Sequence, residues 1–443
     1  MERMAPADAR TYWMSKVIPS DQFLLYAFEY QDVPLGDLAD GLRRRAATIP
    51  DLNIRVLDIP GSLDRPIWVE DSVDDEQVVV HRGMLSWPEC LVKLGMVMAD
   101  QLQPARHAWR IHLFGPVPDS PRGRGIVAVL QVCHALGDGR RSSEIARQLF
   151  DPQEPPPDCR SPMTSRLPSS VVAAGAAVIG CVTLPIRVGR MLWLGARAYR
   201  TVRDRPPTRA PGYPTTVLNN PPGPDRSLRV LVVDRDTFSS SPTVTVGALT
   251  AISVALERYL DLRGASAGAE LTIGRSNQSS SRNNFRNAGI DLHLEVDDLA
   301  QRSAAIADEI ASARDLDDEP ARTAQRRADD AVPAILTHWG TRQFDITAHP
   351  DRVTGVTVVS SVYRGAADLR LGGGRVLFTS GFPALSPAQG LTHGVHGIGD
   401  TVAISFTTSP RILPDVDTYL GYLDEGIDAV RAIDQDSDSS PRE

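Results

Sequence analysis

The chain has 443 residues, a formal net charge of −8, 42% hydrophobic residues and four cysteines. This length predicts about two or three folding units, and the negative charge argues against nucleic acid as a partner. Because Cys90, Cys133, Cys159 and Cys181 form no CxxC pair, neither a zinc site nor a disulfide framework is expected. The N-terminal segment lacks the apolar core of a signal peptide, so we expect a cytoplasmic protein.

The first 150 residues alternate between short helical and strand patterns. The expected elements are a helix from Ser20-Asp21 into 22–26, a helix at 37–45, strands at 66–69, 78–80, 109–114 and 125–133, and a helix opening at 142–145 and continuing to about 149. The strand at 125–133 is a nearly continuous apolar run, which is typical of a strand buried on both faces.

The second half starts again after two Pro-rich segments at 151–168 and 206–224. Its expected elements are strands at 228–233, 271–273, 291–296, 355–362, 375–378 and 402–406, with helices at 245–260, 298–330 and 419–433. These patterns predict an α/β protein with subdomains at 1–155 and 216–433. A crossover at 156–215 joins them, and a disordered acidic tail follows at 434–443.

The segment Cys133-His134-Ala135-Leu136-Gly137-Asp138-Gly139 places a histidine at the end of the buried strand, before a helix. Histidine has a pKa near about 6.5 and can accept a proton at neutral pH. It is therefore a natural base for an alcohol that attacks an acyl thioester. Asp138 can pair with an arginine and hold the turn, or orient the imidazole, and Gly139 gives a backbone position that a side chain would crowd. HxxxDG alone is short, and a buried histidine beside an Asp-Gly bend is the simpler interpretation.

The neighbouring residues resemble a known family. The wax ester synthase/diacylglycerol acyltransferase family carries HHxxxDG, and this chain has CHALGDG. SDQFLLYAFE, RPIWVED, HAWRIHLFG with Trp109, and VAISFTTSPRILPDVDTYLGYLDEGIDAV are similar to family segments in the same order. The resemblance implies that His134, Asp138 and Gly139 are catalytic, and that Trp109, Cys133 and Ser361 bind substrate.

The chain departs from this family at three motifs. Cys133 replaces the first histidine of the pair. An Asn-Asp pair of the family is missing at Thr245-Val246, and its NVPGP segment has become Ser361-Val362-Tyr363-Arg364-Gly365. These departures put the substrate, and turnover itself, in question.

The resemblance also implies an architecture and an activity. Two halves like chloramphenicol acetyltransferase subunits form a pseudo-dimer, with His134 in a tunnel at their interface. The implied reaction is O-acyl transfer from acyl-CoA to a hydroxyl of a lipid-like acceptor, with no metal or bound cofactor. An acyltransferase that uses an acyl carrier protein as donor, in polyketide or envelope lipid synthesis, and a non-catalytic lipid-binding scaffold are the alternatives.

The crossover contains an apolar stretch at 171–184, closed by Pro185 and Arg187. It is shorter than the roughly 20 residues of a membrane span. Arg187, Arg190, Arg197 and Arg200 lie near Trp193, which favours peripheral contact with an anionic membrane surface. A crossover helix packed on the protein, with its arginines in water, is the alternative.

Two further sets of polar residues allow more than one interpretation. Arg275, Arg282 and Arg286 are candidates to pair with Asp138 across the two halves. His393 and His396 form an HxxH pair in a Gly-rich segment, but no carboxylate or cysteine cluster supports a metal site there.

Overall fold

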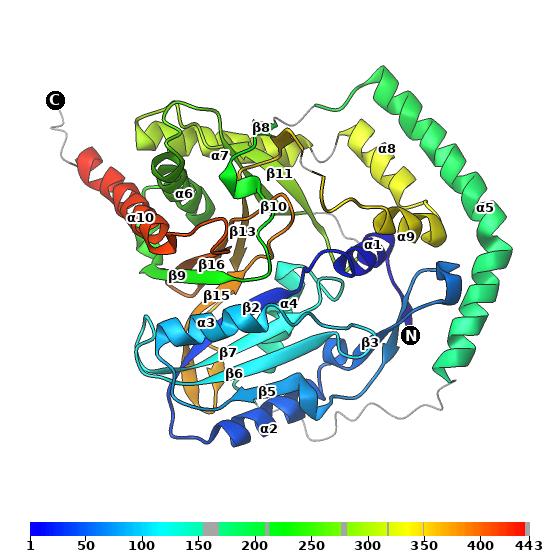
Figure 1. The fold of residues 1–443 in the computed structure, drawn as a ribbon, viewed down its shortest axis with the longest axis horizontal. Coiled ribbons are helices and arrows are strands. Elements are labelled where there is room, and N and C mark those ends of the chain that lie inside the picture. The colour runs from blue at the N-terminus through cyan, green and yellow to red at the C-terminus, as the bar shows by residue number, and fades with distance from the viewer. Residues whose placement is uncertain (154–167, 209–211, 276–280, 317–318, 349, 439–443) are drawn as a thin grey trace.

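In the computed structural model, two six-stranded sheets lie side by side, and the N-terminal and C-terminal halves of the chain each contribute most of one of them (Figure 1). The structure describes residues 1–153, 168–208, 212–275, 281–316, 319–348 and 350–438. Residues 154–167 of the Pro-rich segment at 151–168 and the last five residues of the predicted tail lie outside the described residues.

The first sheet has the strand order β14-β15-β2-β7-β6-β5. Its strands are β2 (Gln22–Glu29), β5 (Val78–His81), β6 (Trp109–Val117), β7 (Gly125–Val132), β14 (Arg370–Leu371) and β15 (Gly374–Phe382). β7 is buried along its whole length, as its apolar run predicts.

The expected helix at 20–26 is wrong, because these residues enter β2 beside β7. Phe23 and Leu25 face one apolar cluster and Leu24 and Tyr26 face another, so both faces of β2 are covered. A strand in this position is apolar at every residue, and its sequence lacks the alternation that marks a half-buried strand.

Helices cover the first sheet on both faces, and a small three-stranded sheet extends it. These elements are α1 (Pro6–Ser15), α2 (Leu35–Ala46), α3 (Trp87–Val97), α4 (Gly139–Leu149), β1 (Glu2–Arg3), β3 (Ile54–Leu57) and β4 (Ile67–Glu70). Side chains of α2 and α4 share one apolar cluster with the sheet. Side chains of α3 share another, to which the second sheet also contributes. This second cluster joins the two halves.

The second sheet has the strand order β11-β10-β13-β16-β17-β9. Its strands are β9 (Ser227–Asp234), β10 (Gly268–Gly274), β11 (Phe285–Asp291), β13 (Thr357–Tyr363), β16 (Thr392–Ile398) and β17 (Thr401–Thr408). Its core is shared with α6 (Val244–Leu260), α7 (Leu299–Asp315) and α10 (Val416–Asp438). The strand expected at 291–296 lies earlier in the chain, as β11, and α10 continues through 434–438 into the predicted tail.

The first sheet also contains strands from the second half of the chain. β15 pairs with β2 in an antiparallel ladder, and β14 pairs with β15. The chain leaves the second sheet after β13, adds these two strands to the first sheet, and returns as β16. The first sheet therefore needs residues from both halves, whereas the predicted boundaries divide the chain at the crossover.

The crossover is a single helix, α5 (Ser169–Asp204), which lies along one side of the molecule (Figure 1). It packs against α8 (Pro320–Asp329) and the short helix η2 (Pro60–Ser62), while α9 (Ala334–Arg342) packs against α1. The helix continues through Pro185, so the apolar stretch at 171–184 is the first part of a helix of 36 residues. By length and composition α5 is the one helix of the described residues that could cross a membrane.

Candidate active site

The polar turn after β7 is held by the start of α4. Asp138 is the N-cap residue of α4, and its Oδ1 accepts a hydrogen bond of 3.0 Å from the backbone N–H of Arg141. Gly137 allows this close turn, because a Cβ there would lie 2.8 Å from the Cβ of Arg141. The turn therefore fixes His134 directly after the end of the strand.

The second carboxylate oxygen of Asp138 reaches across to the other half. Its Oδ2 accepts a hydrogen bond of 3.0 Å from the backbone N–H of Asn284, and the Asp138 N–H donates to the Arg282 carbonyl at 3.2 Å. The expected arginine partner is therefore replaced by a backbone amide. The guanidinium of Arg282 pairs instead with Asp51 at 2.8 Å and with Glu2 at 2.9 Å.

The imidazole of His134 is enclosed by residues from both halves. Its Nδ1 lies 2.6 Å from Nε2 of Gln22, the first residue of β2. The ring stacks on Phe285 of β11, with ring centroids 5.4 Å apart and planes inclined by 17°. Asn283 Nδ2 donates to the His134 carbonyl at 2.8 Å. Gln22 and Phe285 thus hold the ring and Asn283 holds the backbone, while Nε2 makes no hydrogen bond to any described residue.

The electrostatic surroundings keep His134 uncharged. Burial lowers the pKa of His134, while a hydrogen bond to the Gly137 carbonyl and the charge of Asp138 oppose this shift. The lowered pKa means that the ring is neutral at neutral pH and can accept a proton. Burial raises the pKa of the adjacent Cys133 thiol, so that thiol stays protonated and is a poor nucleophile.

A cavity of about 560 Å³ opens between the two halves at this point. His134, Asp138 and Gly139 line it from the first half, and Ser361 lines it from the second. Gly139 lies close to Val362, because a Cβ at Gly139 would be 3.0 Å from Cγ2 of that residue. These four predicted site residues therefore share one cavity, which is large enough for a small-molecule substrate.

Two predicted substrate-binding residues do not line this cavity. Trp109 is fully buried in the core of the first half, where its indole N–H donates to the Leu52 carbonyl at 2.8 Å. Cys133 is 1% exposed and packs in the same core. The structure does not place either residue at the cavity, because both side chains pack in the apolar cluster shared with α2 and α4. Ser361 does reach the cavity, and its hydroxyl lies 2.7 Å from that of Thr245.

Several residues of the site had no signal in the sequence. Gln22 begins an apolar strand, and nothing in its neighbours indicates a contact with a histidine 112 residues away. Asp8 of α1 is 1% exposed and accepts hydrogen bonds from the backbone N–H groups of Arg282 and Asn283 at 2.8 and 3.0 Å. Asp8 and Asp138 together hold the segment at 281–284 against the turn that carries His134.

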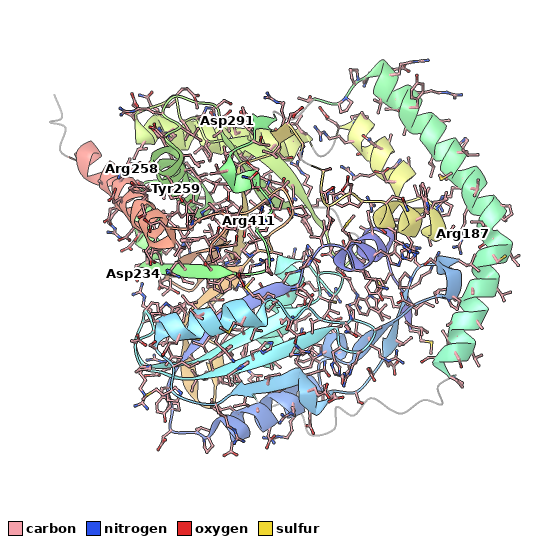
Figure 2. The ribbon with its side chains drawn as sticks, viewed as in Figure 1. Arg187, Asp234, Arg258, Tyr259, Asp291 and Arg411 are labelled. Carbon is pink, nitrogen blue, oxygen red and sulfur yellow. The ribbon has the colours of Figure 1, made fainter. Side chains whose placement is uncertain are left out.

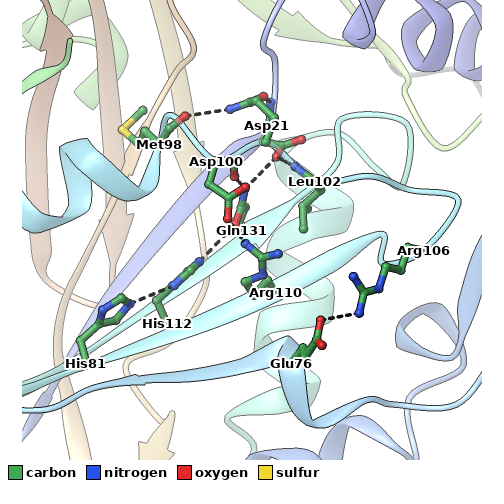
Figure 3. Close-up of polar contacts among 11 residues, drawn as sticks. Asp21, Glu76, His81, Met98, Asp100, Leu102, Arg106, Arg110, His112 and Gln131 are labelled. Carbon is green, nitrogen blue, oxygen red and sulfur yellow. Dashed lines mark hydrogen bonds and ion pairs between the residues drawn. The ribbon is translucent and has the colours of Figure 1, made fainter. Parts of the chain in front are cut away.

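A buried polar chain supports the start of β2 (Figure 3). Gln131 Nε2 donates to Asp21 Oδ2 at 2.8 Å, and His112 Nε2 lies 3.1 Å from Gln131 Oε1. Asp21 Oδ2 also accepts from the backbone N–H of Leu102 at 2.6 Å. Burial raises the pKa of Asp21 to about 6, while these hydrogen bonds oppose the rise. The chain fixes Asp21, and with it the position of Gln22.

The two histidines of the HxxH pair point to opposite faces of β16, since residues three apart on a strand alternate. His393 lies in the core of the second half, bonded to Thr357 Oγ1 at 2.9 Å and Tyr419 OH at 2.8 Å. His396 lines the cavity. A metal ion cannot bind both rings. Elsewhere in the described residues, the side chains of Asp291, His293 and Glu295 come within 4.8 Å of one another at the end of β11.

The predicted membrane-facing residues separate into two groups. Arg190, Trp193, Arg197 and Arg200 are exposed on α5. Arg187 does not face away from the protein as predicted, because its guanidinium forms two hydrogen bonds of 3.0 Å to the carboxylate of Asp64 on the body of the protein (Figure 2). Arg187 therefore holds the helix to the protein.

Solved structures share this arrangement over nearly their whole length. The wax ester synthase/diacylglycerol acyltransferase from Marinobacter aquaeolei VT8 has a TM-score of 0.64 at 19% identity, covering 98% of this chain and 99% of that one. The starter condensation domain of rhizomide synthetase in complex with C8-CoA and Leu-SNAC has a TM-score of 0.55 at 11% identity, covering 97% and 94%. The first condensation domain of the CDA synthetase gives 0.55 at 13%, covering 97% and 96%.

These likenesses define the class of protein: an α/β fold of two chloramphenicol acetyltransferase-like halves, as in wax ester synthases and condensation domains. Residues 283–431 match the family model of the WS/DGAT C-terminal domain. This match and the structural likeness confirm the resemblance to the wax ester synthase/diacylglycerol acyltransferase family.

Proposed function

We propose that the protein is an O-acyltransferase that moves a fatty acyl group from acyl-CoA to a hydroxyl of a lipid-like acceptor. The observation that carries this proposal is the position of His134, whose neutral imidazole lines a cavity between the two halves. Its Nε2 makes no hydrogen bond to a described residue and is available to a substrate. The acyltransferase fold supports it. A solved condensation domain of the same fold is a complex with C8-CoA, which supports a thioester donor.

The reaction needs one proton to move twice. His134 Nε2 takes the proton of the acceptor hydroxyl as the oxygen attacks the thioester carbonyl. The tetrahedral intermediate then collapses, the carbon–sulfur bond breaks, and the leaving thiolate receives the proton from Nε2. No acyl-enzyme forms, so donor and acceptor occupy the cavity together.

The neighbours of His134 would keep its ring in the productive state. When Nε2 accepts a proton, Nδ1 must already carry one. The amide nitrogen of Gln22 faces both Nδ1 and the Gly137 carbonyl, so a half-turn of this amide, which brings its oxygen to Nδ1, selects the productive tautomer. Phe285 restricts rotation of the ring by stacking.

The test is transfer by the purified protein. Palmitoyl-CoA is supplied with hexadecanol or a diacylglycerol, and ester formation is followed by mass spectrometry for the parent and for His134→Ala. An ester made by the parent and lost in the variant supports the proposal. Transfer only from an acyl carrier protein would favour the carrier-dependent alternative. Lipid binding without transfer from any donor would favour the scaffold, which the motif departures at Cys133 and 361–365 keep open.

We further propose that the protein contacts the inner face of the plasma membrane through α5, as a peripheral protein in the cytoplasm. Large apolar side chains on the solvent side of this helix are exposed, namely Val171, Val178, Ile179, Val182, Ile186, Leu192 and Trp193. Exposed arginines follow at 190, 197 and 200. The opposite side packs on the protein, and Gly180 allows close approach to Leu63. An apolar strip beside basic residues favours an interfacial position over a span.

A further inference from the structure

A buried guanidinium lines the cavity without a carboxylate partner. Arg364 is 4% exposed and directly follows β13. Its Nη1 donates to Tyr26 OH at 3.0 Å and its Nη2 to the Ser380 carbonyl at 3.4 Å, while Nε has no partner. No carboxylate of the described residues comes within ion-pair distance of it. A buried charge without a counter-ion is costly, so this position calls for an explanation.

Arg364 and His396 meet at a glycine of β15, and all three residues line the cavity. A Cβ at Gly381 would lie 2.9 Å from Arg364 Nη2 and 3.0 Å from His396 Nε2, so both side chains pack closely on Gly381. The guanidinium and the imidazole are therefore neighbours on the cavity wall. His396 is 4% exposed, and neither of its ring nitrogens has a hydrogen bond in the described part of the chain.

These groups come from three strands that meet where the two sheets join. Arg364 ends β13 and His396 belongs to β16, both in the second sheet, while Gly381 belongs to β15 in the first. Gly381 lies opposite Leu24 of β2, two residues along from Gln22, which contacts His134. Two residues of a strand span about 7 Å. Gly381 is therefore a short distance from the proposed base, and the two line the same cavity.

The sequence marks the same position as a departure from the family. Arg364 stands where the NVPGP segment of the family has glycine, in the aligned residues 361–365. A residue without a side chain has thus been replaced by a buried cation that faces the cavity. The change alters the chemistry of the cavity wall from apolar to anion-binding.

We propose that Arg364 and His396 form a subsite that binds the carboxylate of a substrate. The subsite deepens the proposed function, on which it rests, by naming the substrate class: one of the two substrates carries a carboxylate besides its reacting group. Arg364 supplies the charge, and its guanidinium lines the cavity beside His396. Burial and the neighbouring Arg364 charge hold the pKa of His396 well below its usual value, so its ring adds a hydrogen bond and no charge.

The first test measures binding and needs no turnover. Octanoate and octanol are each titrated into the full-length protein, and binding is measured by calorimetry. The parent is compared with Arg364→Met and with a matched control, Arg263→Met, at a surface arginine whose side chain is 82% exposed. A hydrogen bond to a charged group in a buried site corresponds to about 10- to 100-fold in affinity. We expect Arg364→Met to weaken octanoate by this factor and to leave octanol unchanged. Equal octanoate affinity in all three proteins would overturn the proposal.

A second variant separates binding from folding, since Arg364 also contacts Tyr26 of the other half. Gly381→Ala puts a methyl group 2.9 Å from Arg364 Nη2 and 3.0 Å from His396 Nε2, so it displaces the two side chains of the subsite without removing either. Gly421→Ala, where a Cβ meets nothing within 4 Å, is the matched control. Loss of octanoate binding in Gly381→Ala alone supports the subsite. Unchanged binding in a folded Gly381→Ala would show that Arg364 only clamps the two halves.

Transfer assays identify which substrate carries the carboxylate. Hydroxy acids are compared with their methyl esters as acceptors, and CoA thioesters of monoacyl dicarboxylates are compared with those of plain fatty acids as donors. We expect the free acid to be preferred in one of these pairs, and the preference to vanish in Arg364→Met. No acid preference in either pair, despite transfer, would overturn the subsite. Octanoate binding that depends on Arg364 without any transfer would leave the subsite standing and refute the acyltransferase proposal.

Discussion

Gln22 Nε2 lies 2.6 Å from His134 Nδ1 and 2.5 Å from the Gly137 carbonyl oxygen, although Gln22 and His134 are 112 residues apart. The contact exists because β2 and β7 are neighbours in the first sheet, and their register places Gln22 opposite Val132. A single amide therefore ties the start of one central strand to the turn that follows the other.

Gln22→Leu should lower acyl transfer by about 100-fold, because a base that turns out of line by about 1 Å loses about that much. Gln103→Leu, at an exposed glutamine in a loop, is the control and should keep its rate. The readout is kcat in single-turnover transfer at equal folded concentration. A positioning role predicts a fall in kcat with little change in KM, and an unchanged kcat would remove Gln22 from the site.

His134→Ala should lower transfer by about 100- to 10,000-fold, the range for losing a general base. Cys133→Ser should cost far less, because Cys133 is a core residue with a raised thiol pKa. The two variants are compared with the parent for transfer and for thermal unfolding. An inactive Cys133→Ser beside an active His134→Ala would point to covalent thiol catalysis instead.

The rate of transfer should fall only at acid pH, and below the usual histidine midpoint. Burial lowers the pKa of His134, so the neutral base form persists below about 6.5, where an exposed histidine is half protonated. A profile of kcat/KM against pH measures this midpoint for the free enzyme. A midpoint above about 6.5 would contradict the surroundings described for the ring.

Asp138→Ala should destabilise the fold by about 1 to 2 kcal/mol, because it removes the helix cap and leaves the Asn284 amide without its acceptor. Asp298→Ala is the matched control, since Asp298 caps α7 through one hydrogen bond of 2.9 Å to the Gln301 amide. Urea unfolding measures the free energy of unfolding of both variants. If the two variants cost the same free energy, the contact between the halves through Asp138 contributes nothing.

Replacing Arg190, Arg197 and Arg200 together by Gln should weaken binding to anionic vesicles by about 100-fold, at about 1 kcal/mol for each basic residue. The same triple change at Arg10, Arg44 and Arg82, which are exposed and lie outside α5, alters the net charge equally and is the control. Co-sedimentation with vesicles containing phosphatidylserine is the measurement. Equal loss in both triples would assign the effect to net charge alone.

The sequence by itself determined the elements whose pattern is local. The apolar run at 125–132 ends at His134, and a capped helix follows, because strand, turn and cap each depend on neighbouring residues. The apolar spacing of α6 also sufficed. The membership of β2 in a sheet was missed, because burial on both faces removes the alternation that identifies a strand.

Only the tertiary structure decided which distant residues meet. Asp138 binds the Asn284 amide rather than an arginine side chain, because the segment at 281–284 is held by Asp8 of the first half. Arg364 packs on Gly381 only because β15 leaves its own half and pairs with β2. Contacts of this kind depend on how the two sheets pack, and the spacing of residues along the chain does not predict that packing.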